Sequence, residues 1–193
     1  VVDEIQAADA ATELSNLAEQ GVDIIVVGAS EIAEPLPDLT EKYPDIFWYC
    51  NCGAGFETLP GLAQTTDDSS EISYSAGYAS GLLLQDRGDS SAAFIGCCDL
   101  GFEKEAFLAF EMGLQAVDPS FTVTYVPTGA YPYDFDNVPN ATEAFNNAVA
   151  TGVGVVYPYL GGAHEPVVQL ANESGVAVLS AGASDVCTRE GDV

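Results

Sequence analysis

The sequence predicts an α/β fold in which parallel strands alternate with helices. Two observations support this prediction. Short apolar runs rich in β-branched residues alternate with longer stretches of helical periodicity over the 193 residues. The short runs are apolar throughout, which is typical of strands buried on both faces of a parallel sheet. Such alternation predicts parallel sheets with helices on both sides.

Six apolar runs are predicted as buried strands. They are residues 22–27 (VDIIVV), 45–50 (DIFWYC), 91–96 (SAAFIG), 121–126 (FTVTYV), 153–158 (VGVVYP) and 176–180 (VAVLS). Each has the length of an ordinary strand and is too short for a helix of several turns.

Helical patterns lie between these runs. In residues 8–20, Leu14 and Leu17 share one apolar face, and Gly21 is placed to end the helix. Proline residues near the start of residues 31–43 fit only the first turn of a helix, which makes that pattern weaker. The other predicted helices are residues 71–85, 102–117, 141–150 and 163–174.

Residues 53–70 (GAGFETLPGLAQTTDDSS) interrupt this rhythm with a long polar segment. We interpret the segment as the crossover between two lobes, so that residues 1–68 and 69–193 form separate domains. Ser69 or Ser70 is the expected cap of the helix that follows. That helix carries Gly77 and Gly81 four residues apart, a spacing that in a soluble chain indicates close packing against another helix.

Charge excludes several classes of partner. Thirty acidic residues face only four basic ones, giving a formal net charge of −26. Nucleic acids and anionic membranes would be repelled, because their phosphates are bound by Lys and Arg. The acids are spread along the chain, which is typical of the solvated surface of a salt-adapted or secreted protein. No stretch is apolar for the ~18 residues of a membrane span.

The loops that follow the predicted strands are the expected ligand site. In open parallel sheets, ligands bind beyond the carboxyl ends of the strands. The loops there include residues 96–102 (GCCDLGF), 127–137 (PTGAYPYDFDN), 159–165 (YLGGAHE) and 180–185 (SAGASD). Their Gly, Ala, Ser, Asp and aromatic residues suit a small polar ligand.

Signals for catalysis, a metal or a cofactor are weak. The sequence has no Walker A motif, no G-x-S-x-G elbow and no complete dinucleotide fingerprint. A nucleophilic Cys97 or Cys98 would need a base, and His164 is the single histidine. The cysteine spacings are not those of a zinc site. We therefore expect neither an enzyme nor a resident cofactor or metal, with catalysis by Cys98 or His164 as the minor alternative.

The order of several segments resembles one known family. LAEQGVDIIVVGAS, EKYPDIFWY, ISYSAGYASGLLL, AAFIGCCDLGFEKEAFLAFEMGLQAVDP and YPYLGGAHEPVVQLANESGVAVLS follow one another as in the basic membrane protein (BMP) family. These are substrate-binding lipoproteins of ABC importers, similar to a purine-nucleoside receptor. The resemblance implies a type I periplasmic-binding-protein fold of two Rossmann-like lobes with a ligand cleft between them.

The resemblance also implies a function and a location. The expected protein is an extracytoplasmic, lipid-anchored receptor that delivers a nucleoside or similar small polar ligand to an ABC permease. The alternative is a ligand-sensing domain of a signalling receptor. Family members have a strand before the part matched here and further strands after it, so we expect this chain to be an incomplete middle portion that lacks the anchor.

Binding residues carry over from the family only in part. The Gly-Gly turn maps to Gly161, Gly162 and Ala163, whose backbone amides are expected to face the ligand. Asp99 stands where the family has an acid, and Asp185 lies near the family's sugar-binding acid. Ser30 falls where the family often carries a stacking aromatic.

The stacking aromatic itself must therefore come from elsewhere. Phe56 and Tyr159 are the aromatic candidates, with Tyr131 and Tyr133 as alternatives. For Asp99, two roles remain open: a ligand acceptor, or a cap of the helix that follows.

The five cysteines suit an exported protein. We expect at least one disulfide among Cys50, Cys52, Cys97 and Cys98, with Cys187 as the free thiol.

Overall fold

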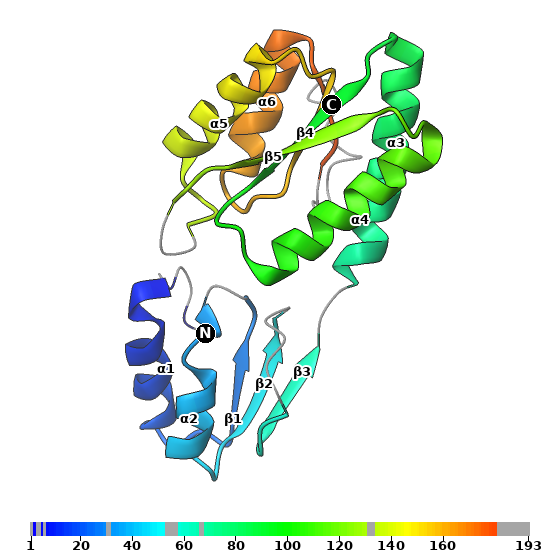
Figure 1. Cartoon of the computed structure of the whole chain (residues 1–193). Helices are drawn as coiled ribbons and strands as arrows, with labels where there is room; N and C mark the ends of the chain where they lie inside the picture. Colours follow the sequence, from blue (N-terminus) through cyan, green and yellow to red (C-terminus); the bar gives the residue numbers. More distant parts are fainter. Residues whose placement is uncertain are drawn as a thin grey trace. The chain divides into compact units, whose positions relative to one another are not determined.

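The computed structural model describes residues 2, 5, 7–29, 32–52, 58–65, 68–130 and 134–180. It divides into two compact units, Val1–Asp67 and Asp68–Val193. Each unit is an α/β structure built on its own parallel sheet (Figure 1). The predicted fold class, α/β with parallel sheets and flanking helices, is therefore confirmed.

The first unit contains a three-stranded parallel sheet in the order β1-β2-β3. Its strands are β1 (Ile24–Val27), β2 (Phe47–Asn51) and β3 (Leu62–Thr65). β3 corrects the interpretation of residues 53–70 as crossover alone. This edge strand is only half-buried and contains one large apolar residue, Leu62, so its composition carries little strand signal.

Three short helical segments accompany this sheet: η1 (Ala7–Asp9), α1 (Ala10–Ala18) and α2 (Leu36–Lys42). The core of the unit joins Leu14, Leu36 and Trp48 on one face of the sheet. Pro35 and Pro37 lie at the start of α2, as their missing N–H groups require.

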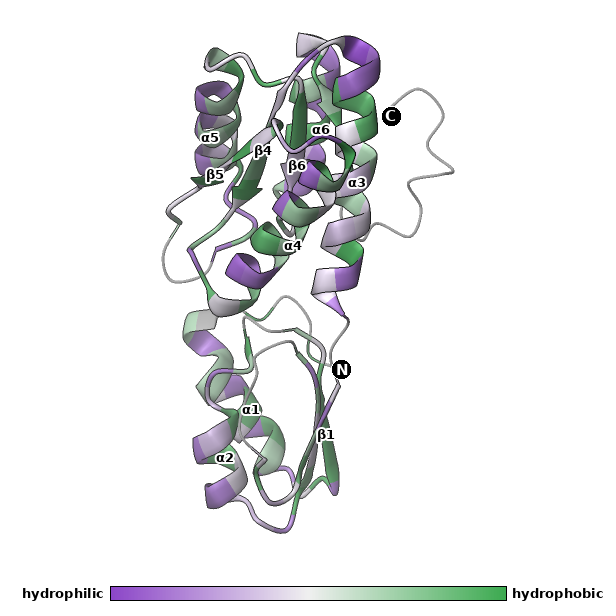
Figure 2. Ribbon diagram, turned by 45° about the vertical axis from the view of Figure 1, so that its right-hand side comes forward, coloured by the Kyte–Doolittle hydropathy of each residue, from purple (hydrophilic) through white to green (hydrophobic). Residues whose placement is uncertain are grey.

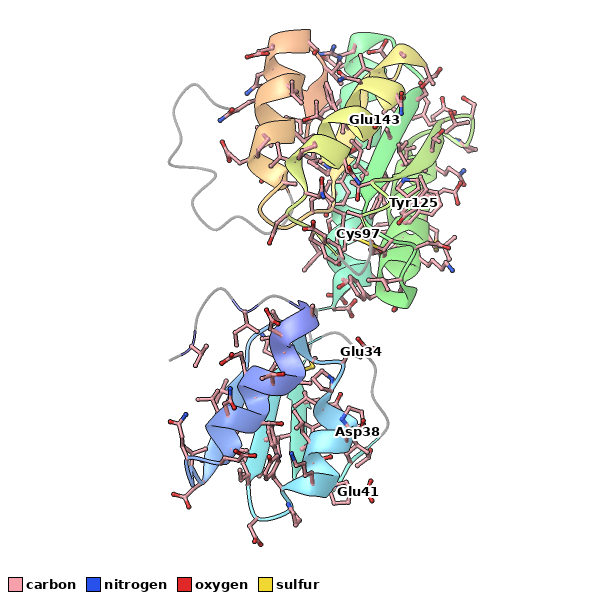
Figure 3. The ribbon with its side chains drawn as sticks, turned by 90° about the vertical axis from the view of Figure 1, so that its left-hand side faces the viewer. Glu34, Asp38, Glu41, Cys97, Tyr125 and Glu143 are labelled. Atoms are coloured by element: carbon pink, nitrogen blue, oxygen red, sulfur yellow. A yellow bond between two sulfur atoms is a disulfide. The ribbon has the colours of Figure 1, made fainter. Side chains whose placement is uncertain are left out.

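Acidic and apolar side chains both lie on the outside of this unit. Glu34, Asp38 and Glu41 project outward at and along α2 (Figure 3). On the sheet, Ile24 and Val26 are exposed while their neighbours Ile25 and Val27 are buried. The core of this unit therefore lies on one face of the sheet.

The second unit contains a four-stranded parallel sheet in the order β5-β4-β6-β7. Its strands are β4 (Ser91–Gly96), β5 (Thr122–Pro127), β6 (Val155–Pro158) and β7 (Ala177–Val178). The two central strands, β4 and β6, are buried along almost their whole length. Burial on both faces explains why these runs are apolar throughout.

Helices cover both faces of this second sheet. α3 (Ser69–Arg87) and α4 (Gly101–Val117) pack on one face, and α5 (Val138–Ala150) and α6 (His164–Ser174) on the other (Figure 1). The helices carry both hydrophobic and hydrophilic residues, whereas β4 is mainly hydrophobic (Figure 2). Among the described residues, no helix has both the length and the apolar composition of a membrane span.

α3 and α4 approach each other closely at glycines. A Cβ atom added to Gly77 would lie 2.0 Å from the carbonyl oxygen of Phe110, and one added to Gly113 would lie 2.0 Å from that of Tyr74. Neither position has room for a side chain, because the atoms it would meet belong to backbone. The packing role predicted for Gly77 and Gly81 is confirmed.

The first turn of α3 is capped one residue earlier than predicted. The Asp68 carboxylate accepts the N–H groups of Ser70 and Glu71 at 3.1 and 3.0 Å. Ser69 and Ser70 lie inside the helix, so the prediction of a serine cap is wrong. Asp and Ser are nearly equally favoured as N-caps. Because Asp68, Ser69 and Ser70 are adjacent, residue preference alone does not determine which of them is the N-cap.

Candidate functional site

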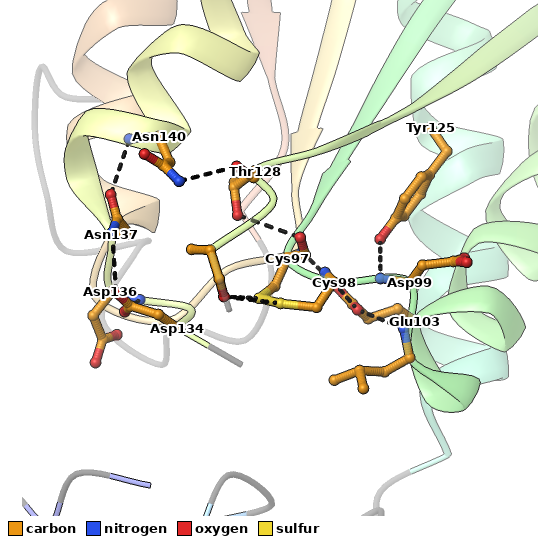
Figure 4. The surroundings of a disulfide bond; sticks show 12 residues. Cys97, Cys98, Asp99, Glu103, Tyr125, Thr128, Asp134, Asp136, Asn137 and Asn140 are labelled. Carbon is orange, nitrogen blue, oxygen red and sulfur yellow. Dashed lines mark hydrogen bonds between the residues drawn. A yellow bond between two sulfur atoms is a disulfide. The ribbon is translucent and has the colours of Figure 1, made fainter. Parts of the chain in front are cut away.

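The candidate site is the edge of the second sheet where the strands end. Described parts of three loops meet there: residues 97–100 after β4, residues 128–130 and 134–137 after β5, and residues 159–163 after β6 (Figure 4). This is the edge at which open parallel sheets bind ligands.

The loop after β4 is organised by a residue that the sequence analysis did not single out. The carboxylate of Glu103, in the first turn of α4, accepts the backbone N–H groups of Cys97, Cys98 and Leu100. The distances from Cys98 and Leu100 are 3.1 and 3.0 Å. Glu103 is fully buried. The sequence signal for this arrangement is a glutamate in the first turn of the predicted helix, and in the structure it lies three residues after the N-cap Leu100.

Asp99 lies at the tip of this loop with its side chain largely in solvent. Its backbone φ is +59°, and its N–H donates to the Tyr125 hydroxyl at 3.0 Å. Its carboxylate lies 3.1 Å from the Lys104 ammonium, and both side chains are more than half exposed. Leu100 is the N-cap residue of α4. The capping role left open for Asp99 is thus excluded.

Tyr125, whose hydroxyl accepts the Asp99 N–H, is half-buried. Burial is the main cause that raises the pKa of Tyr125 to about 12, and the negative charge of Glu103 acts in the same direction. The Tyr125 hydroxyl therefore stays protonated and is a neutral acceptor near neutral pH.

All four described cysteines are paired. Cys50 is bonded to Cys52, and Cys97 to Cys98, which confirms the prediction of at least one disulfide. Cys187 lies outside the described residues. The Sγ atoms of Cys97 and Cys98 lie 3.5 and 3.3 Å from the Ala130 carbonyl oxygen (Figure 4). A disulfide has no hydrogen to donate, so these are packing contacts in the bonded state.

The Cys97–Cys98 pair belongs to a small hydrophobic cluster at the candidate site. Both residues are buried and pack with Phe135, with Phe102 and Leu160 beside them. A buried, bonded pair offers no thiolate, so this geometry does not support the alternative of cysteine catalysis.

The Gly-Gly turn after β6 is bonded within the chain. The N–H groups of Gly161 and Ala163 donate to the Phe135 carbonyl oxygen at 3.1 and 3.3 Å. The N–H of Gly162 donates to the carboxylate of Asp136, another residue that the sequence analysis did not identify. The three amides expected to face a ligand therefore already have acceptors in this structure.

His164 joins the ends of β6 and β7. Its Nδ1 lies 3.0 Å from the Pro158 carbonyl oxygen and its Nε2 lies 2.8 Å from the Ser180 hydroxyl. A carbonyl only accepts, so Nδ1 carries a hydrogen, and in the neutral ring Nε2 accepts the Ser180 hydroxyl. Both nitrogens are occupied in a buried setting, which suits a structural residue better than a general base.

Tyr159 is the one proposed stacking residue that the structure describes. Its ring stacks on Phe94 of β4, with centroids 5.5 Å apart. Its hydroxyl lies 3.5 Å from that of Ser69 at the start of α3. Its ring is therefore part of the aromatic core under the sheet edge.

Several predicted site residues lie outside the described residues. They are Ser30, Phe56 and Asp185, with the alternatives Tyr131 and Tyr133. In the part of the chain that the structure describes, no group of three or more His, Cys, Asp or Glu side chains is placed to hold a metal ion.

Polar loops at the carboxyl edge of a parallel sheet are where α/β proteins of this kind bind small molecules, and the comparisons with known proteins give the family. Residues 2–186 match the Bmp family model, described as ABC transporter substrate-binding protein, PnrA-like. The chain belongs to this family, which is one of binding proteins and not of enzymes. The predicted resemblance is confirmed. Among curated protein sequences, none matches the chain significantly.

Solved structures of low sequence identity share the fold. A solute-binding protein of an ABC transporter system from Conexibacter woesei is 21% identical, with a TM-score of 0.58 over 90% of this chain and 55% of its own. A transcriptional activator of the comK gene from Bacillus halodurans is 20% identical, with a TM-score of 0.62 over 95% and 60%.

A third structure was solved with a ligand. The solute-binding protein of an ABC transporter from R. palustris, in complex with benzoate, is 14% identical, with a TM-score of 0.61 over 93% of this chain and 49% of its own. This chain thus spans about half to three-fifths of the length of these three structures.

Proposed function

We propose that the full-length protein is the solute-binding component of an ABC importer and binds a nucleoside or a similar small polar solute. The observation that carries this proposal is the family match over residues 2–186. In this proposal the protein is extracytoplasmic and lipid-anchored, and its partner is the ABC permease. Residues 1–68 belong to the N-terminal lobe and residues 69–193 to the C-terminal lobe.

The proposed ligand lies at the carboxyl edge of the second sheet. Asp99 supports this position, because its exposed carboxylate can accept hydrogen bonds from ligand hydroxyl or ring N–H groups. Engagement of the Gly-Gly turn requires the ligand to replace Asp136 as the acceptor of the Gly162 N–H. The proposed binding residues are Ser30, Phe56, Asp99, Tyr159, Gly161, Gly162, Ala163 and Asp185.

A thermal-shift panel on the full-length protein tests this function. At a free ligand concentration 100 times the dissociation constant, binding raises the free energy of unfolding by roughly 2.7 kcal/mol. We expect a nucleoside to raise the melting temperature, and sugars, free bases and amino acids to raise it less. If no nucleoside shifts the melting temperature, this ligand class is excluded while the fold assignment stands.

A ligand-sensing domain of a signalling receptor is the second candidate. One observation favours it: a protein described as a transcriptional activator shares the fold over 95% of this chain. The two candidates differ in their partners. Co-purification of the full-length protein with an ABC permease favours the importer, and a fused or bound kinase favours the sensor.

A further inference from the structure

We propose that Glu103 is a positioning residue of the binding edge: it holds the backbone of residues 97–100 so that Asp99 presents its carboxylate to solvent. This inference rests on the proposed function, because it assigns to Glu103 a part in solute binding. The observation behind it is the convergence of three backbone N–H groups on one buried carboxylate (Figure 4).

Every N–H group of this loop donates to a side chain. Those of Cys97, Cys98 and Leu100 bond to Glu103, and that of Asp99 bonds to Tyr125. The loop is therefore held from α4 on one side and from β5 on the other. No N–H of the loop is left for a ligand, so the loop can offer only acceptors, namely its carbonyl oxygens and the Asp99 carboxylate.

Three bonds exceed what the start of a helix needs. A capping glutamate ordinarily accepts a single backbone N–H, that of the N-cap residue, and here that is the bond from Leu100. The additional bonds from Cys97 and Cys98 reach back into the loop. They compensate the burial of a carboxylate that takes part in neither of the ion pairs found among the described residues.

The side chains of Glu103 and Tyr125 pack closely against the backbone of Gly96. A Cβ atom added there would lie 2.7 Å from Oε1 of Glu103 and 2.8 Å from the Tyr125 hydroxyl. The end of β4 thus lets both side chains lie directly against the backbone. Asp99 in turn adopts the left-handed conformation, which is uncommon outside glycine and persists where the surroundings enforce it.

Affinity measurements on the full-length protein test the proposal with Glu103→Gln. The amide keeps one acceptor oxygen but turns an NH₂ group toward a backbone N–H. We expect affinity for the nucleoside probe, chosen from adenosine, guanosine and uridine by its effect on the wild type, to fall about tenfold to a hundredfold. Glu111→Gln removes the same charge from the same helix away from the loop and should leave affinity within about twofold.

A double-mutant cycle with Asp99→Asn separates positioning from general damage. If Glu103 acts through Asp99, Glu103→Gln should cost little further affinity once Asp99 is changed. Additive losses, or an unchanged affinity in Glu103→Gln, would overturn the proposal. If Glu103→Gln does not fold, Glu103→Asp keeps the charge but shortens the side chain that accepts the three N–H groups, and the same cycle applies.

Backbone hydrogen exchange tests Glu103 without a ligand. We expect the amides of Cys97, Cys98 and Leu100 to exchange at least tenfold faster in Glu103→Gln than in the wild type, while amides in α5 keep their rates. Unchanged exchange at these three amides would refute the positioning role. A wild type that binds no nucleoside, together with faster exchange in Glu103→Gln, would exclude nucleosides as the ligand class and leave Glu103 as the organiser of the loop.

Discussion

At the scale of single residues, Asp99 combines an unusual backbone conformation with an exposed side chain that is paired only with the exposed Lys104. It is the one non-glycine residue in the described ranges with a positive φ. Asp tolerates this conformation better than most residues, because its short polar side chain fits the left-handed region. The loop thus holds a carboxylate at the sheet edge without using it for capping, which is the arrangement that a ligand acceptor needs.

The change Asp99→Asn separates binding from stability. Asn tolerates the same backbone, and the lost ion pair with Lys104 is exposed, so the melting temperature without ligand should change little. Loss of a charged acceptor contributing roughly 1.5–3 kcal/mol should lower ligand affinity about tenfold to a hundredfold. Calorimetric titration measures this. Asp86→Asn, at an exposed position of α3, is the control. Unchanged affinity in Asp99→Asn would remove Asp99 from the site.

The burial of Tyr157 leads us to expect a loss of stability at alkaline pH. Burial is the main cause that raises its pKa to about 12; the nearby Ser73 hydroxyl acts in the opposite direction, although the two hydroxyls form no hydrogen bond of good geometry. The fold favours the neutral phenol over the charged phenolate. The contribution of this phenol to the free energy of unfolding is therefore intact below about pH 10, the pKa of an unfolded tyrosine, and is lost as pH rises toward 12.

Urea unfolding at pH 9, 10 and 11 measures this effect. The wild type should lose more free energy of unfolding over this range than Tyr157→Phe, by an amount on the order of 1 kcal/mol. Tyr78→Phe, at an exposed tyrosine, should behave as the wild type. Parallel curves for wild type and Tyr157→Phe would contradict the assignment.

At the scale of elements, the contact between α3 and α4 depends on glycine. In Gly113→Ala the new methyl group would meet the backbone of Tyr74 and Tyr78, which cannot move unless the helices separate. We expect a loss of about 1–3 kcal/mol in the free energy of unfolding, measured by denaturant titration. The neighbouring Met112→Ala, at an exposed position, should change it by no more than about 0.5 kcal/mol. Equal effects would show that the helices can separate at little cost.

Elements with strong periodicity are those that the sequence predicts well. The runs around Phe94 and Val156 are apolar because β4 and β6 are buried on both faces, and the structure confirms them as strands. β3 was not predicted, because this half-buried edge strand lacks the apolar run by which the other strands were identified. The cap of α3 was misassigned because adjacent Asp and Ser residues satisfy the same preference.

The candidate site was predictable in place but not in detail. Topology and loop composition predict the carboxyl edge of the sheet as the site, but they leave the role of Asp99 open between ligand acceptor and helix cap. The roles of Glu103 and Asp136 depend on which backbone N–H groups converge on them, and one of these contacts joins loops 26 residues apart. Sequence spacing indicates that Glu103 lies near a helix start, but not that it accepts two further N–H groups from the loop.

At the scale of the whole molecule, the main feature is the large excess of negative charge. Against a formal net charge of −26, the chain has only four basic residues. Among the described residues, two ion pairs form, Arg87 with Asp89 and Lys104 with Asp99, and all four side chains are substantially exposed. Such pairs contribute little to stability. Repulsion among the acids therefore outweighs attraction, and it destabilises the compact state.

Salt should consequently stabilise this protein. Raising the ionic strength from about 0.01 M to about 1 M shortens the screening length from about 30 Å to about 3 Å, which removes most of the repulsion between surface carboxylates. Because few favourable pairs are lost at the same time, the melting temperature should rise with NaCl, most steeply in the low range where screening changes most. Calorimetry in NaCl, with sucrose as an uncharged control, measures this. A melting temperature that is flat below about 0.3 M NaCl would show that the acids are too far apart to repel, and that their number reflects solubility alone.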